Sequence, residues 1–90
     1  MGKEGYHEPV SELNDNTKHM HRALTSLIEE LEAIDWYNQR VSVCKDKELR
    51  AILEHNRDEE KEHAAMILEW IIAGHAGIPF EPGYENRRTL

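Results

Sequence analysis

The charged segment 56–63, which interrupts a regular apolar pattern, limits most strongly what this chain can fold into. On both sides of it, apolar residues recur at steps of three and four, as on one face of an α-helix; they are Leu49, Ile52, Leu53, Ile67, Trp70 and Ile71. Continued through the segment, this face passes over Asn56, Glu60 and His63, with Glu59 near its edge. A carboxylate and an imidazole are therefore predicted on a face that should be buried, where a charge is costly unless it is paired or bound to a metal.

Two long amphipathic helices are predicted. In the first, over residues 10–43, apolar positions step alternately by four and three with one threonine among them; they are Leu13, Thr17, Met20, Leu24, Leu27, Leu31 and Ile34. Asp46 is a suitable N-cap for a second helix over residues 47–73, and Gly74 is a suitable C-cap. Because the connection between the helices is short, they should be antiparallel neighbours.

The predicted organisation is a flexible leader over residues 1–9, a two-helix domain over 10–74 and an irregular tail over 75–90. Pro9 suits the first turn of a helix, whereas repeated glycines and prolines exclude a long helix in the tail. The predicted fold class is all-α: an antiparallel two-helix hairpin that forms a four-helix bundle on dimerisation. A chain this short buries only roughly 60–65% of its unfolded surface and commonly recruits partners or metals.

Charge and composition exclude several classes of partner. The net charge of -7, from 18 acidic against 11 basic residues, disfavours nucleic acid and favours cations. Cys44 is the single cysteine, so the sequence predicts neither a disulfide framework nor a cysteine zinc site, as suits a reducing interior. The chain has no apolar run of about 18 residues and no apolar signal region at its N-terminus. We therefore expect a soluble cytoplasmic protein without a membrane partner.

The first helix carries acidic residues on two different faces. Glu30 borders the apolar seam, and Tyr37 lies two turns along the same edge. Glu29, Glu32 and Trp36 share the outward face. The helix therefore offers one inward and one outward acidic site.

Glu30, Glu60 and His63 together match half of a known metal-binding pattern. In di-iron four-helix bundles, two helices each supply a Glu and the other two each supply a Glu-x-x-His pair. This chain has one helix of each kind, so a second copy would complete the set and place two irons at a dimer interface. Carboxylates and imidazole suit iron, and carboxylates can converge when they bridge two cations.

Two other interpretations stay open on the residues alone. Glu60 and His63 can be an ordinary polar pair at the margin of a packed helix, with Glu29 and Glu32 as solvated charges and the two aromatic residues as packing. The chain would then be a non-catalytic helical oligomerisation module. Alternatively, a structural metal such as zinc bridges the chains of a dimer.

Three segments of the sequence resemble the encapsulated ferritins: HRA at 21–23, EELEAIDWYNQRV at 29–41 and HNRDEEKEHAAM at 55–66. The likeness covers roughly residues 7–72. It implies a two-helix chain that dimerises to create a ferroxidase centre, with five dimers in a ring-shaped decamer inside an encapsulin shell. The tail over residues 79–90 departs from the family pattern, because it contains no match to the address peptide that directs such proteins into the shell.

The resemblance also implies roles for individual residues. Glu30, Glu60 and His63 would be the iron ligands and catalytic residues, with Tyr37 beside the centre. An outer acidic site would attract metal on its way in; it consists of Glu29 and Glu32, with Trp36 next to it. The expected function is a ferroxidase that oxidises Fe(II) to Fe(III) with oxygen or peroxide, holds two irons per dimer interface and feeds iron storage in a cytoplasmic encapsulin nanocompartment.

Overall fold

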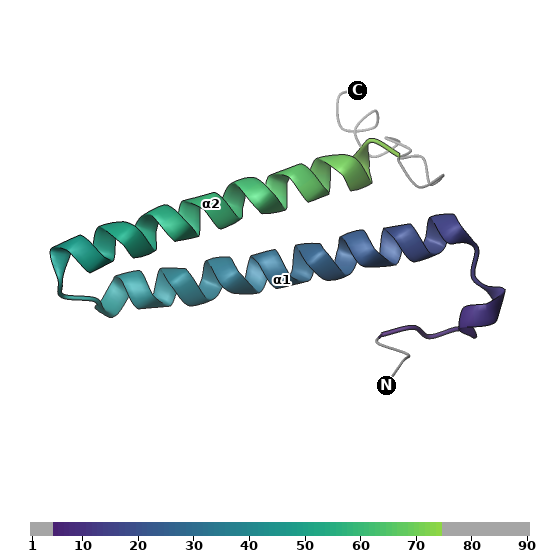
Figure 1. Cartoon of the computed structure of the whole chain (residues 1–90), viewed down its shortest axis with the longest axis horizontal. Helices are drawn as coiled ribbons and strands as arrows, with labels where there is room; N and C mark the ends of the chain where they lie inside the picture. Colours follow the sequence, from purple (N-terminus) through teal and green to yellow (C-terminus); the bar gives the residue numbers. More distant parts are fainter. Residues whose placement is uncertain (1–4, 75–90) are drawn as a thin grey trace, which may run out of the picture.

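The computed structural model describes residues 5–74, which form two long helices and one short helical turn. In chain order these are the 3-10 helix η1 (Val10–Glu12), α1 (Asp15–Val43) and α2 (Lys47–Ile72). The two long helices run side by side in opposite directions and are joined by a short connection at one end (Figure 1). The predicted all-α antiparallel hairpin is confirmed for this part of the chain. Dimerisation and the division into leader, domain and tail stay predictions, and residues 1–4 and 75–90 lie outside the described residues.

Helix α1 begins at Asp15, five residues later than the apolar pattern predicted. Asn14 has an extended backbone, and its side-chain oxygen accepts a hydrogen bond of 2.8 Å from the backbone N–H of Thr17. This contact satisfies one of the free N–H groups of the first turn and fixes Asn14 as the N-cap. The residues that follow Pro9 form only the turn η1, and the extended backbone at Leu13 separates it from α1.

Helix α2 begins where the sequence predicted. The Asp46 side chain accepts a hydrogen bond of 2.8 Å from the backbone N–H of Leu49, so it caps the helix as expected. The helix ends at Ile72, one residue before the predicted end, and Gly74 follows with a φ of 86°. A left-handed backbone at that position favours glycine and ends the helix. The connection between the helices is therefore only three residues long, from Cys44 to Asp46.

The hairpin buries very little of itself. Among the described residues, the buried apolar side chains are Val41 and Ala64. Large apolar side chains stay exposed along both helices, at Leu24, Ile28, Leu31, Trp36, Val43, Leu49, Ile52, Met66, Leu68 and Ile72. Leu49 and Ile52, which were predicted on a buried face, are 48% and 57% exposed. In a two-helix hairpin each helix has one neighbour, so positions beside the seam are left uncovered.

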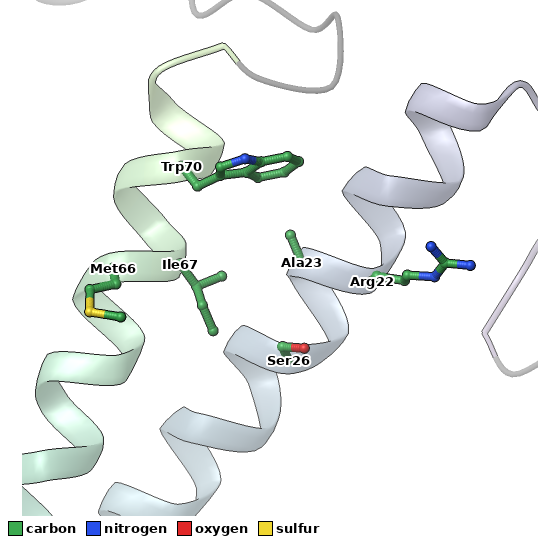
Figure 2. A pocket seen from close by; sticks show the side chains of 6 residues that line it. All are labelled: Arg22, Ala23, Ser26, Met66, Ile67 and Trp70. Atoms are coloured by element: carbon green, nitrogen blue, oxygen red, sulfur yellow. The ribbon is translucent and has the colours of Figure 1, made fainter.

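Near the open end of the hairpin, the seam between α1 and α2 widens into a hollow of about 410 Å³. It is lined by Arg22, Ala23, Ser26, Met66, Ile67 and Trp70. Ile67 and Trp70 extend from α2 toward α1, where the small side chain of Ala23 leaves space, and Arg22 points away (Figure 2). Residues 5–74 do not fill this end of the seam.

Candidate metal centre

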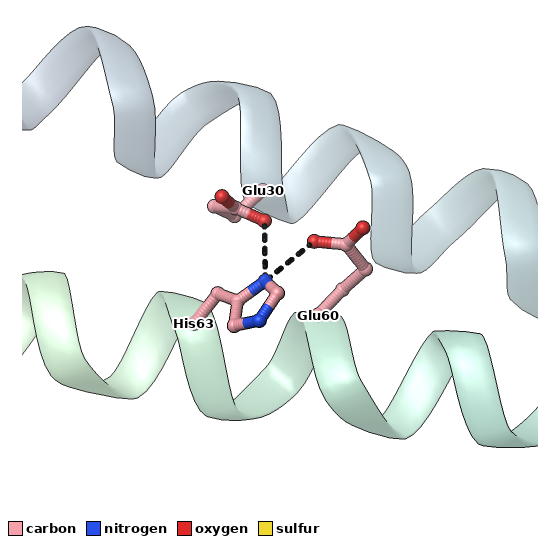
Figure 3. A group of neighbouring side chains, drawn as sticks. All are labelled: Glu30, Glu60 and His63. Carbon is pink, nitrogen blue, oxygen red and sulfur yellow. Dashed lines mark hydrogen bonds and ion pairs between the residues drawn. The ribbon is translucent and has the colours of Figure 1, made fainter.

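The predicted residues Glu30, Glu60 and His63 meet where α1 and α2 face each other. Glu30 comes from α1, whereas Glu60 and His63 lie one turn apart on the same side of α2 (Figure 3). His63 Nδ1 is 3.3 Å from Glu60 Oε1 and 3.7 Å from Glu30 Oε1. One ligand atom from each residue lies within 4.8 Å of the other two. Two carboxylates and one imidazole thus converge with the spacing of a metal site, and we call these three residues the triad.

The triad lies at the edge of the hairpin and not in a closed interior. The side chains of Glu30 and Glu60 are 25% and 24% exposed, and that of His63 is 46% exposed. The sequence placed His63 on a buried face, and within one chain this expectation is wrong. The reason is the thinness of the hairpin, because two helices cannot enclose a residue that lies beside their line of contact. Additional ligands can therefore approach the triad from outside the chain.

Hydrogen bonds within the triad shift the pKa values of all three side chains. The hydrogen bond between the two carboxyl groups raises the pKa of Glu30 and lowers the pKa of Glu60. The pKa of His63 is raised, chiefly by its hydrogen bond to Glu60 and further by the negative charge of Glu30. Two carboxylates this close disfavour ionisation of both, so Glu30 holds its proton to a higher pH than an isolated glutamate does. A cation binds the deprotonated groups, so protons compete with it for Glu30 and His63, whose pKa values are raised.

The other predicted site residues lie outside the triad. Glu29 and Glu32 are exposed on α1, as is Trp36 at 53%. Tyr37 is half-buried, and the guanidinium carbon of Arg40 lies 5.1 Å from the centre of its ring. Across residues 5–74, the group of acidic and imidazole side chains close enough to share a metal ion contains none of these four predicted residues.

Two contacts near the helices were not predicted from the sequence. Arg57 of α2 donates a hydrogen bond of 3.0 Å to the side-chain oxygen of Asn38 on α1, which ties the helices together one turn from Glu60. Near the N-terminus, the rings of Tyr6 and His21 stack with their centres 4.2 Å apart. The partners in each contact are 15 or more residues apart, so no local spacing could have indicated them.

Comparisons with known proteins find relatives that match most of the chain. The sequence profile of the EncFtn-like family matches residues 5–77. The "Encapsulated ferritin-like protein" of Rhodospirillum rubrum is 63% identical over 65 residues, which is 72% of this chain and 46% of that protein. The "Ferritin-like protein" of Thermotoga maritima is 64% identical over 66 residues, which is 73% of this chain and 58% of that protein. The chain therefore spans about half the length of these curated relatives.

A more distant curated relative and a solved structure also match this chain. The "Encapsulin nanocompartment cargo protein EncC" of Myxococcus xanthus is 43% identical over 42 residues, 47% of this chain and 32% of that protein. The crystal structure of protein ne0167 from Nitrosomonas europaea superposes with a TM-score of 0.75 at 60% identity, and the match covers 94% of this chain and 87% of that one. The helical fold is therefore shared with an experimentally determined structure.

Proposed function

Because the chain belongs to the EncFtn-like family, we propose that it is a ferroxidase that oxidises Fe(II) to Fe(III). The observation that carries this proposal is the triad, whose ligand atoms lie within 4.8 Å of one another. Carboxylate oxygens and an imidazole nitrogen suit iron as ligands. The net charge of -7 favours the approach of cations to such a site.

The proposed di-iron centre requires two copies of the chain. One triad supplies half of the ligands found in di-iron four-helix bundles, and the partial exposure of His63 leaves room for a second chain to supply the rest. In the dimer, Glu30 and its counterpart would bridge two Fe(II) ions. Glu60 and His63 of each chain would complete one coordination sphere each. Two iron ions per dimer interface follow from this arrangement.

The redox change belongs to the iron, and the protein supplies ligands and geometry. Two Fe(II) ions release two electrons, which with two protons convert oxygen to hydrogen peroxide or hydrogen peroxide to two molecules of water. The carboxylates offset the added positive charge of Fe(III). Protons compete with Fe(II) for Glu30 and His63, whose pKa values are raised, because only the deprotonated groups are ligands.

We assign supporting roles to the remaining predicted residues. Tyr37, half-buried on α1, is proposed to lie beside the di-iron centre. The exposed Glu29 and Glu32 are proposed as an outer acidic site that attracts metal on its way in, with Trp36 next to it. These carboxylates are suited to transient capture of cations, since both face water.

The proposal extends to a larger assembly. Two curated relatives are named as an encapsulated ferritin-like protein and an encapsulin cargo protein. We infer a homo-oligomer, with five dimers in a decameric ring, held inside an encapsulin nanocompartment in the cytoplasm. The two helices that the structure describes enclose no mineral cavity of their own, so iron storage would need such an outer shell.

Anaerobic titration with Fe(II), followed by exposure to air, tests the proposed function. We expect about one iron per chain and a rapidly appearing ferric absorbance, because each triad completes half of a two-iron site. Glu30→Ala and His63→Ala should lose both signals. Glu32→Ala is the matched control, since it removes a carboxylate from the same helix and should alter the uptake rate without abolishing the centre.

Each contrary outcome has a distinct meaning. A full oxidation rate in Glu30→Ala or His63→Ala would overturn the assignment of the triad. Metal uptake without oxidation would favour a structural metal that bridges the dimer. No metal uptake would favour a non-catalytic helical oligomerisation module. A Glu32→Ala variant identical to the wild type in iron uptake would return Glu29 and Glu32 to ordinary solvated charges.

A further inference from the structure

Glu59 lies between two histidines on α2, next to the triad but not part of it. Its Oε2 atom is 3.7 Å from Nε2 of His55, and its Oε1 atom is 4.0 Å from Nε2 of His63. Both histidines are four residues away along the helix, so the three side chains occupy one side of α2 in successive turns. The Glu59 side chain is 47% exposed, which leaves it free to change rotamer.

The two ring nitrogens of His63 face different groups. Nδ1 faces the carboxylates of Glu60 and Glu30, at 3.3 Å and 3.7 Å. Nε2, on the opposite side of the ring, faces Glu59. The ring therefore has one side turned toward the proposed iron ligands and another turned toward a carboxylate outside them. A histidine that binds a metal almost always donates its other N–H to a carboxylate, a carbonyl or water.

We propose that Glu59 is the positioning residue of the iron site: it accepts the Nε2–H of His63 and keeps Nδ1 directed at Glu30 and Glu60. This inference rests on the proposed function, because it concerns the same metal ligand. The present separation of 4.0 Å is about 1 Å longer than a hydrogen bond, and side-chain rotation on one helix is sufficient to close it. His55 contacts the other carboxylate oxygen of Glu59, and this contact favours the orientation in which Glu59 faces His63.

Positioning has a measurable consequence for metal binding. An imidazole that can rotate presents either ring nitrogen, so part of the population has Nδ1 turned away from the carboxylates. A carboxylate on Nε2 removes this freedom and makes Nδ1 a better donor. Loss of such a partner typically weakens metal binding by about 10-fold to 100-fold.

Zinc is a suitable redox-inert probe for the whole 90-residue chain, because its binding can be measured without iron oxidation. Competition with a chelator should show zinc bound about tenfold more weakly by Glu59→Ala than by the wild type. Glu62→Ala is the matched control and should bind as the wild type does; it removes the same charge from an exposed residue adjacent to His63 in sequence. Glu59→Gln should recover most of the loss, since its amide oxygen also accepts an N–H.

Nitrogen-15 NMR of the His63 ring supplies a readout that general loss of charge would not change. In the zinc-bound wild type we expect zinc on Nδ1 and a proton on Nε2, and in Glu59→Ala a mixture of the two ring orientations. Equal zinc affinity in Glu59→Ala and Glu62→Ala, with the same ring nitrogen bound to zinc, would overturn the positioning role of Glu59. The proposed function would not be affected by that result. A wild type that binds neither zinc nor Fe(II) would overturn the proposed function as well.

Discussion

At the scale of single residues, the triad brings two carboxyl groups and one imidazole together, and this raises the pKa values of Glu30 and His63. One ligand atom from each of the three residues lies within 4.8 Å of the other two, and His63 faces both carboxyl groups through one nitrogen. Glu30 and His63 therefore hold protons to higher pH than isolated side chains do. Metal binding requires the deprotonated groups, so it must weaken as the pH falls.

The raised pKa of His63 gives a first prediction. NMR titration of the metal-free chain should show His63 titrating above 6.5, and Glu60→Gln should lower its pKa, because the hydrogen bond to Glu60 is the largest cause of the shift. The shift also makes stability depend on pH. A histidine whose pKa is raised in the folded state stabilises that state at pH values below its unfolded pKa, and this contribution is lost as the pH rises through its folded pKa. Glu62→Gln is the control and should leave the titration unchanged. An unshifted His63 in the wild type would contradict the geometry.

The identities of the triad residues could be predicted from the sequence, but their surroundings could not. Helical periodicity alone placed Glu60 and His63 on one face of α2 and Glu30 on the inner edge of α1. The same reasoning placed His63 on a buried face, and periodicity cannot tell whether the cover comes from the same chain or from another. Glu59 was placed only near the edge of that face, and its two imidazole neighbours depend on side-chain rotamers that a helical repeat does not specify.

At the scale of the helices, capping residues decide where each helix begins. Asp46 was predicted as the N-cap of α2, and the structure confirms it. For α1 the sequence-based prediction relied on Pro9 alone as a start signal and missed Asn14. Pro9 begins only the turn η1, whereas Asn14 makes the side-chain contact to Thr17 that starts the long helix. Proline is tolerated in the first turn of a helix, whereas a side-chain hydrogen bond to a free backbone N–H stabilises the start of the helix.

The cap of α2 gives a second prediction. Asp46→Ala should lower the free energy of unfolding by about 1 kcal/mol, because it leaves the backbone N–H of Leu49 without its side-chain acceptor. Urea denaturation followed by circular dichroism measures this change, at one fixed protein concentration so that association does not alter the result. Asp46→Asn retains the acceptor and should stay close to the wild type. Equal unfolding curves for Asp46→Ala and the wild type would show that the cap contributes nothing.

At the scale of the whole molecule, the hairpin leaves many large apolar side chains exposed. Val41 and Ala64 are buried within the described part of the chain, while Ile28 and Ile52 are each 57% exposed. Fully burying a side chain of this size contributes about 1.5–3 kcal/mol, so association offers a large gain that folding alone does not supply. The sequence predicted the thin hairpin correctly. It could not specify which exposed residues meet a partner, because both helices carry apolar side chains on more than one side.

Coupling between metal and assembly gives the last prediction. If each di-iron site joins two chains, Fe(II) binds the associated state and not the separate chains, and therefore stabilises association. A site at 100 times its dissociation constant would add about 2.7 kcal/mol, roughly a hundredfold in the association constant. Anaerobic light scattering should show a larger mass with Fe(II) than without it. His63→Ala should keep the metal-free mass under both conditions, because it loses a ligand but none of the exposed apolar residues. One unchanged wild-type mass with and without Fe(II) would show that the metal does not link the chains.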